Sequence, residues 1–140
     1  MSDQYTRKIL ESVTGRTARY TITPAVSGVP AVGVVLTTGA GAWGVYADLI
    51  AAAAILTEHW LCAFFLSIAG VAQIFEVQVR DATPVSLYEL VVDPTAVTTN
   101  LGQFSPPYPI WRPGSAQTQA RAGGAAAKVI SVKTLVGLGL

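Results

Sequence analysis

Hydrophobic and polar residues alternate along short segments of this chain, with turn-forming residues between the segments. Residues 75–80, Phe-Glu-Val-Gln-Val-Arg, alternate with a period of two, which is typical of a β-strand with one buried face. After Gly15, runs rich in Thr, Val, Ile and aromatic residues recur at the spacing of antiparallel β structure. We expect strands at about 18–23, 31–37, 44–52, 60–69, 74–80, 86–92, 108–112, 117–122 and 128–136. This many strands predicts an all-β fold, an antiparallel β-sandwich.

Three segments between or within these strands have special sequences. The glycines of residues 39–44, Gly-Ala-Gly-Ala-Trp-Gly, predict a flexible hairpin turn. Small and large residues alternate over 43–48 and favour a strand, whereas the alanines at 51–54 also suit one or two helical turns. We read residues 93–113 as one long connection with a proline cluster at 105–109. Such a loop inside a compact domain usually has a function or contacts a partner.

The first residues look separate from the rest of the chain. Tyr5, Ile9 and Val13 are spaced four apart, with charged residues between them, which suits a short amphipathic helix. An extended arm that becomes ordered on a neighbour is an equal alternative, because isolated helices of this length are marginal. We therefore expect an N-terminal arm or short helix over 1–15 and a single sandwich domain over 16–140.

The composition changes the picture of the surface. Only 12% of the 140 residues are charged, about half the share of a typical soluble domain, and the mean hydropathy is +0.49. A membrane or other protein subunits would cover such a surface. The apolar stretches 43–56 and 60–75 are shorter than the roughly 20 residues of a membrane helix, and residues 1–8 lack the apolar region of a signal peptide. We expect protein partners and no membrane.

Candidate chemistry is sparse. A net charge of +1 without clustered Lys or Arg argues against nucleic-acid binding. One cysteine, Cys62, excludes an intramolecular disulfide, and one histidine, His59, leaves no His-rich metal site. Adjacent residues of a strand point to opposite faces, so Glu58 and His59 would not cooperate, and we expect Cys62 to be a buried structural residue.

The carboxylates give no catalytic pattern either. They are dispersed along the sequence, and two of them precede turns, where a short acceptor side chain bonds nearby backbone N–H groups. The dispersed acids are Asp48, Glu76, Asp81, Glu89 and Asp93, of which Asp81 and Asp93 precede the turns. We therefore expect no enzymatic activity, no cofactor and no metal.

Aromatic residues provide the clearest candidate contacts. Trp60, Phe64 and Phe65 lie in the most apolar expected strand and are most simply core residues. Tyr108 and Trp111 lie in a proline-rich stretch and precede Arg112. Trp, Tyr and Arg dominate interface hot spots, so these three are candidate interface residues. A loop packed on its own domain is the equal alternative.

Several stretches of the sequence resemble small structural proteins from the virions of tailed bacteriophages. The stretches are 37–50, from Thr-Thr-Gly-Ala-Gly-Ala-Trp onward, 60–64, Trp-Leu-Cys-Ala-Phe, the strand at 72–80, and a closing section over 109–132. In those proteins that section has Pro-Ile followed by a basic residue and proline, then Ala-Arg-Ala, a glycine-rich turn and a final strand. This sequence departs from the pattern by placing Trp111 between Pro-Ile and Arg112. The resemblance runs from about residue 20 to the end.

The resemblance implies a jelly-roll-like sandwich that assembles in many copies on the virion, most simply as a capsid decoration or cement protein. Its partners would be other copies of itself and the major capsid protein or another virion protein. Phage particles assemble in the bacterial cytoplasm, where a disulfide framework would be reduced. In this interpretation four N-terminal residues clamp a neighbouring subunit: Tyr5, Ile9, Leu10 and Val13.

Two alternatives stay open at this point. A tail or connector component would share the β-rich fold and the assembly chemistry. A host-surface glycan-binding module would instead present Tyr108, Trp111 and the 93–113 segment to a sugar.

Overall fold

The strands of the chain form two sheets that face each other across an apolar core. The computed structural model describes residues 6, 9, 19–23, 33–68, 73–83, 85–94 and 100–138. The strands are β1 (Arg19–Thr23), β2 (Val34–Thr37), β3 (Gly39–Ala40), β4 (Ala42–Trp43), β5 (Ala47–Ile50), β6 (His59–Ile68), β7 (Phe75–Asp81), β8 (Ser86–Val92), β9 (Asn100–Phe104), β10 (Ile110–Arg112), β11 (Thr118–Gly124) and β12 (Val129–Leu138).

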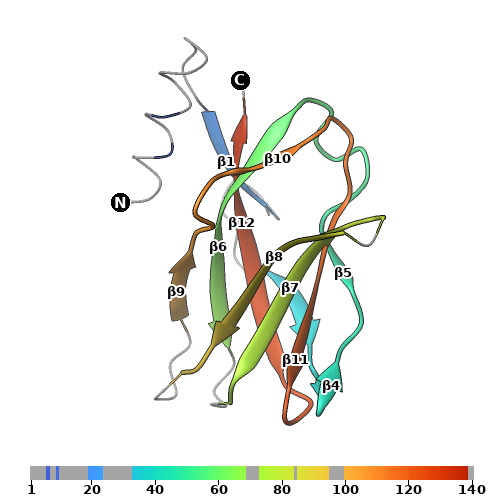
Figure 1. Cartoon of the computed structure of the whole chain (residues 1–140), viewed down its shortest axis with the longest axis vertical. Helices are drawn as coiled ribbons and strands as arrows, with labels where there is room; N and C mark the ends of the chain where they lie inside the picture. The colour runs from blue at the N-terminus through green and yellow to red at the C-terminus, as the bar shows by residue number, and fades with distance from the viewer. Residues whose placement is uncertain are drawn as a thin grey trace.

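Each sheet joins strands that are distant in the sequence. The first sheet has the order β1-β12-β6-β10, with β2 also paired to β12 and β9 to β6. The second has the order β4-β3-β11-β7-β8, with β5 also paired to β11 (Figure 1). All pairs are antiparallel except the short contact of β11 with β3. The fold is thus the expected all-β sandwich.

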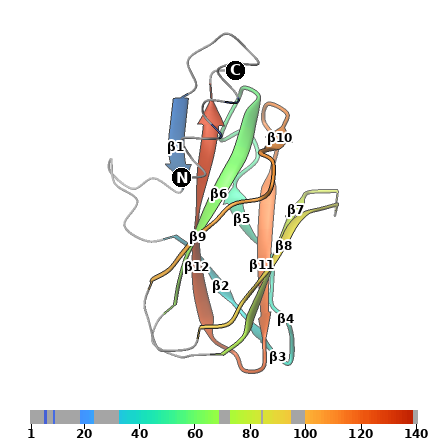
Figure 2. The same cartoon turned by 60° about the vertical axis from the view of Figure 1, so that its left-hand side comes forward.

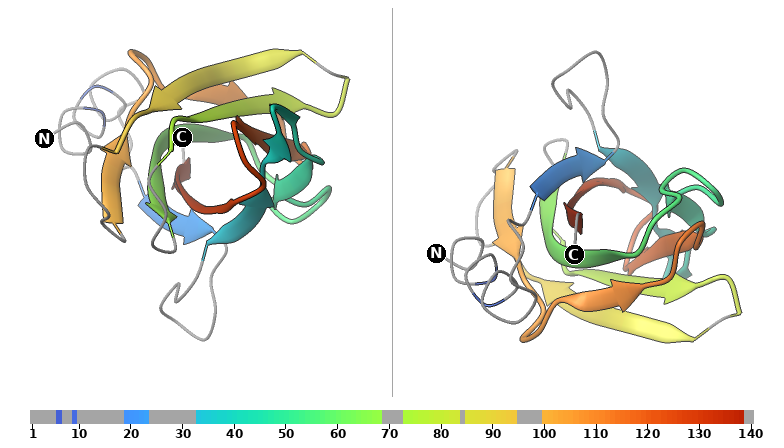
Figure 3. Two further views of the ribbon diagram at one scale, coloured as in Figure 1. Left: turned by 90° about the horizontal axis from the view of Figure 1, so that it is seen from below. Right: turned by 90° about the horizontal axis from the view of Figure 1, so that it is seen from above.

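Figure 3 views the sheets along the long axis of the molecule, and the buried residues of the main core come from strands of both sheets. Alternating residues of β7 point into it, so Phe75, Val77 and Val79 are buried while the residues between them face outward. Phe64 of β6 stacks on Tyr88 of β8, with ring centroids 5.6 Å apart, and so links the sheets. A core of this kind is the main stabilising term of a sandwich.

A β-bulge interrupts the pairing of β6 with β12 in the first sheet. Leu135 of β12 pairs with Ala63, but the next residue pairs with Leu61, so Cys62 is the extra residue on β6. Cys62 and Ala63 therefore both belong to a second buried cluster with Leu135, whereas Leu61 and Phe64 belong to the main core. The prediction of a buried structural cysteine is confirmed.

Most strand predictions are confirmed within the described residues, and that for 86–92 matches β8 at both ends. Three expectations need correction. The strand expected over 44–52 is limited to β5; residues 44–46 are not paired as a strand, although the N–H of Gly44 donates to the carbonyl of Ala122 on β11. Residues 51–54 form turns, with Ala53 at φ 61°, and neither a strand nor a helix. The connection 93–113 contains an additional strand, β9.

The hairpin turn expected over 39–44 is present. Gly39 of β3 pairs with Ala42 of β4, and Gly41 between them has φ 67°, a conformation that glycine adopts without strain.

Most of the N-terminal segment lies outside the described residues. Within it Thr6 and Ile9 are helical, and Ile9 is exposed. Tyr5, Leu10 and Val13 lie outside the described residues, so their predicted contacts stay a prediction.

Candidate functional site

The aromatic residues predicted from the sequence lie beside β10, toward one end of the molecule (Figure 2). Tyr108 is 80% exposed and Trp111 is 50% exposed. Trp111 is opposite Trp60 in the pairing of β10 with β6. Both predicted aromatic residues are therefore on the surface of this chain.

Arg112 has a different environment from these neighbours. Its side chain is only 7% exposed, and its guanidinium donates hydrogen bonds to the hydroxyl of Thr118 at 3.1 Å and the carbonyl of Gln117 at 2.6 Å. Burial lowers the pKa of Arg112, and the charge of Asp81 opposes that shift. Because its hydrogen bonds are directed into its own chain, we leave Arg112 out of the candidate surface.

The candidate acid–base residues do not form a site. His59 is fully buried, with Nδ1 2.9 Å from the carbonyl oxygen of Thr57, whereas Glu58 is exposed, so the two side chains diverge as predicted. Within the described ranges, no three His, Cys, Asp or Glu residues are grouped closely enough to hold a metal ion. The same ranges contain no helix that is long and apolar enough to cross a membrane.

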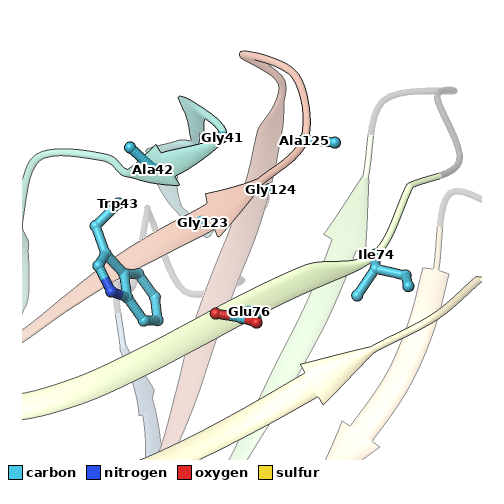
Figure 4. A pocket seen from close by; sticks show the side chains of 8 residues that line it. All are labelled: Gly41, Ala42, Trp43, Ile74, Glu76, Gly123, Gly124 and Ala125. Atoms are coloured by element: carbon cyan, nitrogen blue, oxygen red, sulfur yellow. The ribbon is translucent and has the colours of Figure 1, made fainter.

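A surface cleft of about 480 Å³ is lined by residues of the β3–β4 hairpin, of β7 and of the end of β11 in the second sheet. We call it the Trp43 cleft. The β3–β4 hairpin lies toward the opposite end of the molecule from β10 (Figure 2). Trp43 forms one wall, Ile74 stands opposite, and the carboxylate of Glu76 lies between them (Figure 4). The remaining lining residues are small: Gly41, Ala42, Gly123, Gly124 and Ala125.

The floor of the Trp43 cleft depends on glycine. A Cβ atom on Gly123 would lie 3.2 Å from Cε3 of Trp43, and one on Gly124 would overlap the side-chain amide of Gln73. Trp43 is 38% exposed and Ile74 is 54% exposed, so the walls present apolar surface to solvent. The arrangement suits a flat, mainly apolar group that brings a hydrogen-bond donor to Glu76.

Beside the cleft, five outward-facing side chains form what we call the arginine–aromatic network. The Arg80 guanidinium lies 3.3 Å from the ring centroid of Tyr46. Arg121 lies 4.5 Å from the ring of Trp43 and 4.7 Å from that of Tyr46. The carbonyl of Gln78 accepts hydrogen bonds from the Tyr46 hydroxyl at 2.8 Å and from Arg121 at 2.7 Å. These contacts hold the segment that carries Trp43 and Tyr46 against the sheet.

Glutamines connect both arginines of the network to carboxylates. Gln119 accepts hydrogen bonds from Arg80 at 3.1 and 3.3 Å and donates one to Asp48 at 3.1 Å. Gln78 donates a hydrogen bond to Glu89 at 2.8 Å. Two of the dispersed acids, Asp48 and Glu89, therefore meet in one folded network.

Asp81 has the turn role that its position predicts. Its Oδ1 accepts hydrogen bonds from the backbone of Val85 and Thr83, both at 2.9 Å, and from the Thr83 hydroxyl at 2.8 Å. The bond from the Val85 backbone, followed by those from Thr83, lowers the pKa of Asp81.

Sequence reasoning missed the Trp43 cleft, because its walls come from three segments far apart in the chain.

Comparison with known proteins gives distant structural neighbours only. No protein-family model matches the chain, and no curated protein matches it. The VP2 subviral particle of infectious bursal disease virus is similar at 10% identity and a TM-score of 0.37, and the structure of its Gx strain at 13% and 0.38. Each match covers 86% of this chain and 32% of the other, so this chain spans about a third of their length. These neighbours are viral capsid proteins.

Proposed function

We propose that the chain is a non-enzymatic structural protein that assembles in many copies on a virion, as a capsid decoration or cement protein that stabilises the head of a tailed bacteriophage. The observation that carries the proposal is exposed apolar surface on a chain with 12% charged residues. Among the described residues from 19 onward, the exposed large hydrophobic residues are Val35, Trp43, Val45, Leu56, Ile74, Val85, Val91, Tyr108, Trp111 and Val129. The phage setting rests on the resemblance of the sequence.

Assembly gives these side chains a physical role. Burying one large apolar side chain contributes about 1.5–3 kcal/mol, and association and ordering oppose that gain. Several such contacts per subunit are therefore needed, on more than one face. We expect each subunit to bury more than the roughly 800 Å² per partner of a standard complex, against copies of itself and the major capsid protein or another virion protein.

The decisive experiment is the mass of the purified chain by light scattering, alone and after mixing with empty phage heads. Defined oligomers or uptake onto heads support the proposal. A stable monomer that does not bind heads contradicts it.

The N-terminal clamp is tested separately by removing residues 1–13. We expect weaker attachment to particles and an unchanged thermal unfolding midpoint of the sandwich. Unchanged occupancy on particles would contradict the clamp and leave the decoration role standing.

One observation favours a second candidate, a host-surface glycan-binding module. Tyr108 is 80% exposed and lies close in sequence to the exposed Trp111, which suits stacking on a sugar ring. Binding of the chain to a glycan array, abolished by Trp111→Ala, would favour this function over assembly. A tail or connector component would form rings, and their symmetry in electron micrographs would identify it.

A further inference from the structure

Glu76 differs from its outward-facing neighbours on β7. Gln78 and Arg80 both make side-chain hydrogen bonds, whereas the Glu76 carboxylate has no hydrogen-bond or ion-pair partner in the part of the chain that the structure describes. It lies in the Trp43 cleft between two apolar walls (Figure 4). An occupant that fits therefore has a flat apolar body and one hydrogen-bond donor.

The surface of the same chain presents such a group. Tyr108 is 80% exposed, and its phenol has no hydrogen-bond partner among the described residues. Pro106, Pro107 and Pro109 surround it and restrict the backbone, so little conformational entropy is lost when the side chain is buried in a contact. A phenol that donates to a carboxylate makes a short, charge-assisted hydrogen bond.

Other exposed or cationic side chains fit the Trp43 cleft less well. Val45 and Leu56 are exposed but carry no donor. The guanidiniums of Arg80 and Arg121 already lie over aromatic rings, and that of Arg112 is buried. Trp111 also has an aromatic ring and an N–H donor, but at 50% it is less exposed than Tyr108 at 80%. Among these side chains, Tyr108 combines the greater exposure with an apolar ring and an unused donor.

The two features lie on different sheets and toward opposite ends of the molecule. Tyr108 immediately precedes β10, which pairs with the start of β6 in the first sheet. The Trp43 cleft lies beside the β3–β4 hairpin and the end of β11 in the second sheet (Figure 2). A contact between two different surfaces of identical chains is heterologous and repeats from copy to copy.

We propose that Tyr108 of one copy enters the Trp43 cleft of the next copy, stacks between Trp43 and Ile74, and donates its phenol hydrogen bond to Glu76. Copies then join head to tail, into a ring if the rotation between them closes and into an open chain if it does not. This inference rests on the proposed function, because it supplies the contact by which the chain assembles with itself.

Complementation between two variants tests the contact. Tyr108→Ala removes the inserted ring, and Ile74→Arg fills the cleft and pairs with Glu76. We expect each variant alone to dissociate at about 30-fold higher concentration than the wild type, the loss typical of a central hot spot. Mixed together they retain one intact pair of surfaces, so a one-to-one mixture forms heterodimers and nothing larger. Leu56→Ala, at another exposed apolar residue, is the matched control and changes association by about two-fold at most.

The hydrogen bond between Tyr108 and Glu76 is tested by a double-mutant cycle. The strength of association of each variant is obtained from the mass measured by light scattering. Tyr108→Phe and Glu76→Ala each weaken association, and the double variant is no weaker than the worse single variant if the two groups contact each other. Additive losses overturn the pairing.

The outcomes also separate this contact from the proposed function. If the single variants assemble as the wild type does, or the mixture fails to form heterodimers, the head-to-tail contact is wrong, while uptake of the wild type onto heads still supports the decoration role. If the wild type is monomeric and heads do not bind it, both proposals fail.

Discussion

The two halves of strand β7 differ in how their polar side chains are used. In the half that ends at Asp81, Gln78 and Arg80 belong to the arginine–aromatic network, and Asp81 accepts three hydrogen bonds from the following turn. In the other half, Glu76 faces the Trp43 cleft without a partner among the described residues, and Ile74 is exposed next to it.

This difference separates groups that hold the fold from groups available to a partner. Side chains with a full set of hydrogen bonds already have the interactions that folding gives them, so removing one lowers stability. A bare carboxylate between apolar walls contributes little to the isolated chain and gains a partner only on binding. Substitutions in the two halves should therefore separate stability from assembly.

The largest effect is expected from Gly44→Ala, which should disturb the contacts above both halves of β7 and so lower stability and assembly together. Gly44 lies between Trp43 and Tyr46, and its N–H donates to the carbonyl of Ala122 at 2.8 Å. An added Cβ would overlap the carbonyl oxygen of Thr37, so the segment 44–46 or the end of β2 would have to move. We expect a loss of about 3 kcal/mol in chemical denaturation, together with loss of assembly.

The control for Gly44 is Gly41→Asn. Gly41 also lies in this region but has a positive φ and open space around the position of a Cβ. Asparagine tolerates this conformation, so stability should stay close to that of the wild type. If Gly44→Ala is equally harmless, the close approach does not hold the segment in place.

Tyr46→Ala should remove contacts only in the half of β7 whose side chains belong to the arginine–aromatic network. It removes the ring that both Arg80 and Arg121 contact, and the hydroxyl that donates to Gln78. We expect about 2 kcal/mol of destabilisation by thermal unfolding. Tyr46→Phe keeps the ring and should lose about 1 kcal/mol, the share of the hydrogen bond. Equal losses in the two variants would contradict stacking of the arginines on the ring.

Asp81→Asn tests the same half of β7 through the pH dependence of stability. Because hydrogen bonds, first of all that from the Val85 backbone, lower the pKa of Asp81 in the folded chain, the carboxylate stabilises the fold at neutral pH. That contribution is lost as the pH falls below about 4, where the unfolded state takes up the proton first. The melting temperature of the variant should lie below that of the wild type at pH 7, and the gap should narrow on acidification. A gap independent of pH would contradict this account.

The smallest effect on stability is expected from Glu76→Ala, in the half of β7 where the carboxylate has no partner among the described residues. The change in unfolding free energy should stay within about 0.5 kcal/mol, as for surface positions without partners. Association, followed by light scattering, should nevertheless weaken. A clear loss of stability would mean that Glu76 supports the fold and would remove the contrast between the two halves.

Local pattern predicted the strands well where one face is buried, as in β7 and β8. It failed where a tertiary contact decides the backbone. The alternation over 43–48 predicted a strand, but residues 44–46 run along the edge of β11 without strand pairing, and the Tyr46 side chain contacts Arg80 and Arg121 on the sheet surface. Gly102, at φ 96°, interrupts the pattern of β9 and hid this strand within the connection.

The candidate site was predictable only in part. Tyr108 and Trp111 stand on the surface, whereas the proline-rich sequence left packing on their own domain as an equal alternative. Their interface role stays a prediction. Arg112, adjacent to Trp111, was grouped with them on residue type, and only the fold shows that its guanidinium bonds Thr118 inside the chain. The Trp43 cleft combines residues from three segments on a floor of glycines, a residue type that leaves no hydrophobic signal.

The position of β12 at residues 129–138 has a consequence for synthesis of the chain. This strand pairs with β1, β2 and β6, so three earlier strands lack their common neighbour until it has left the ribosome. Because translation adds about 5–20 residues per second, these earlier strands remain unpaired along one edge for several seconds during synthesis. A nascent or truncated chain that stops before β12 cannot close the first sheet.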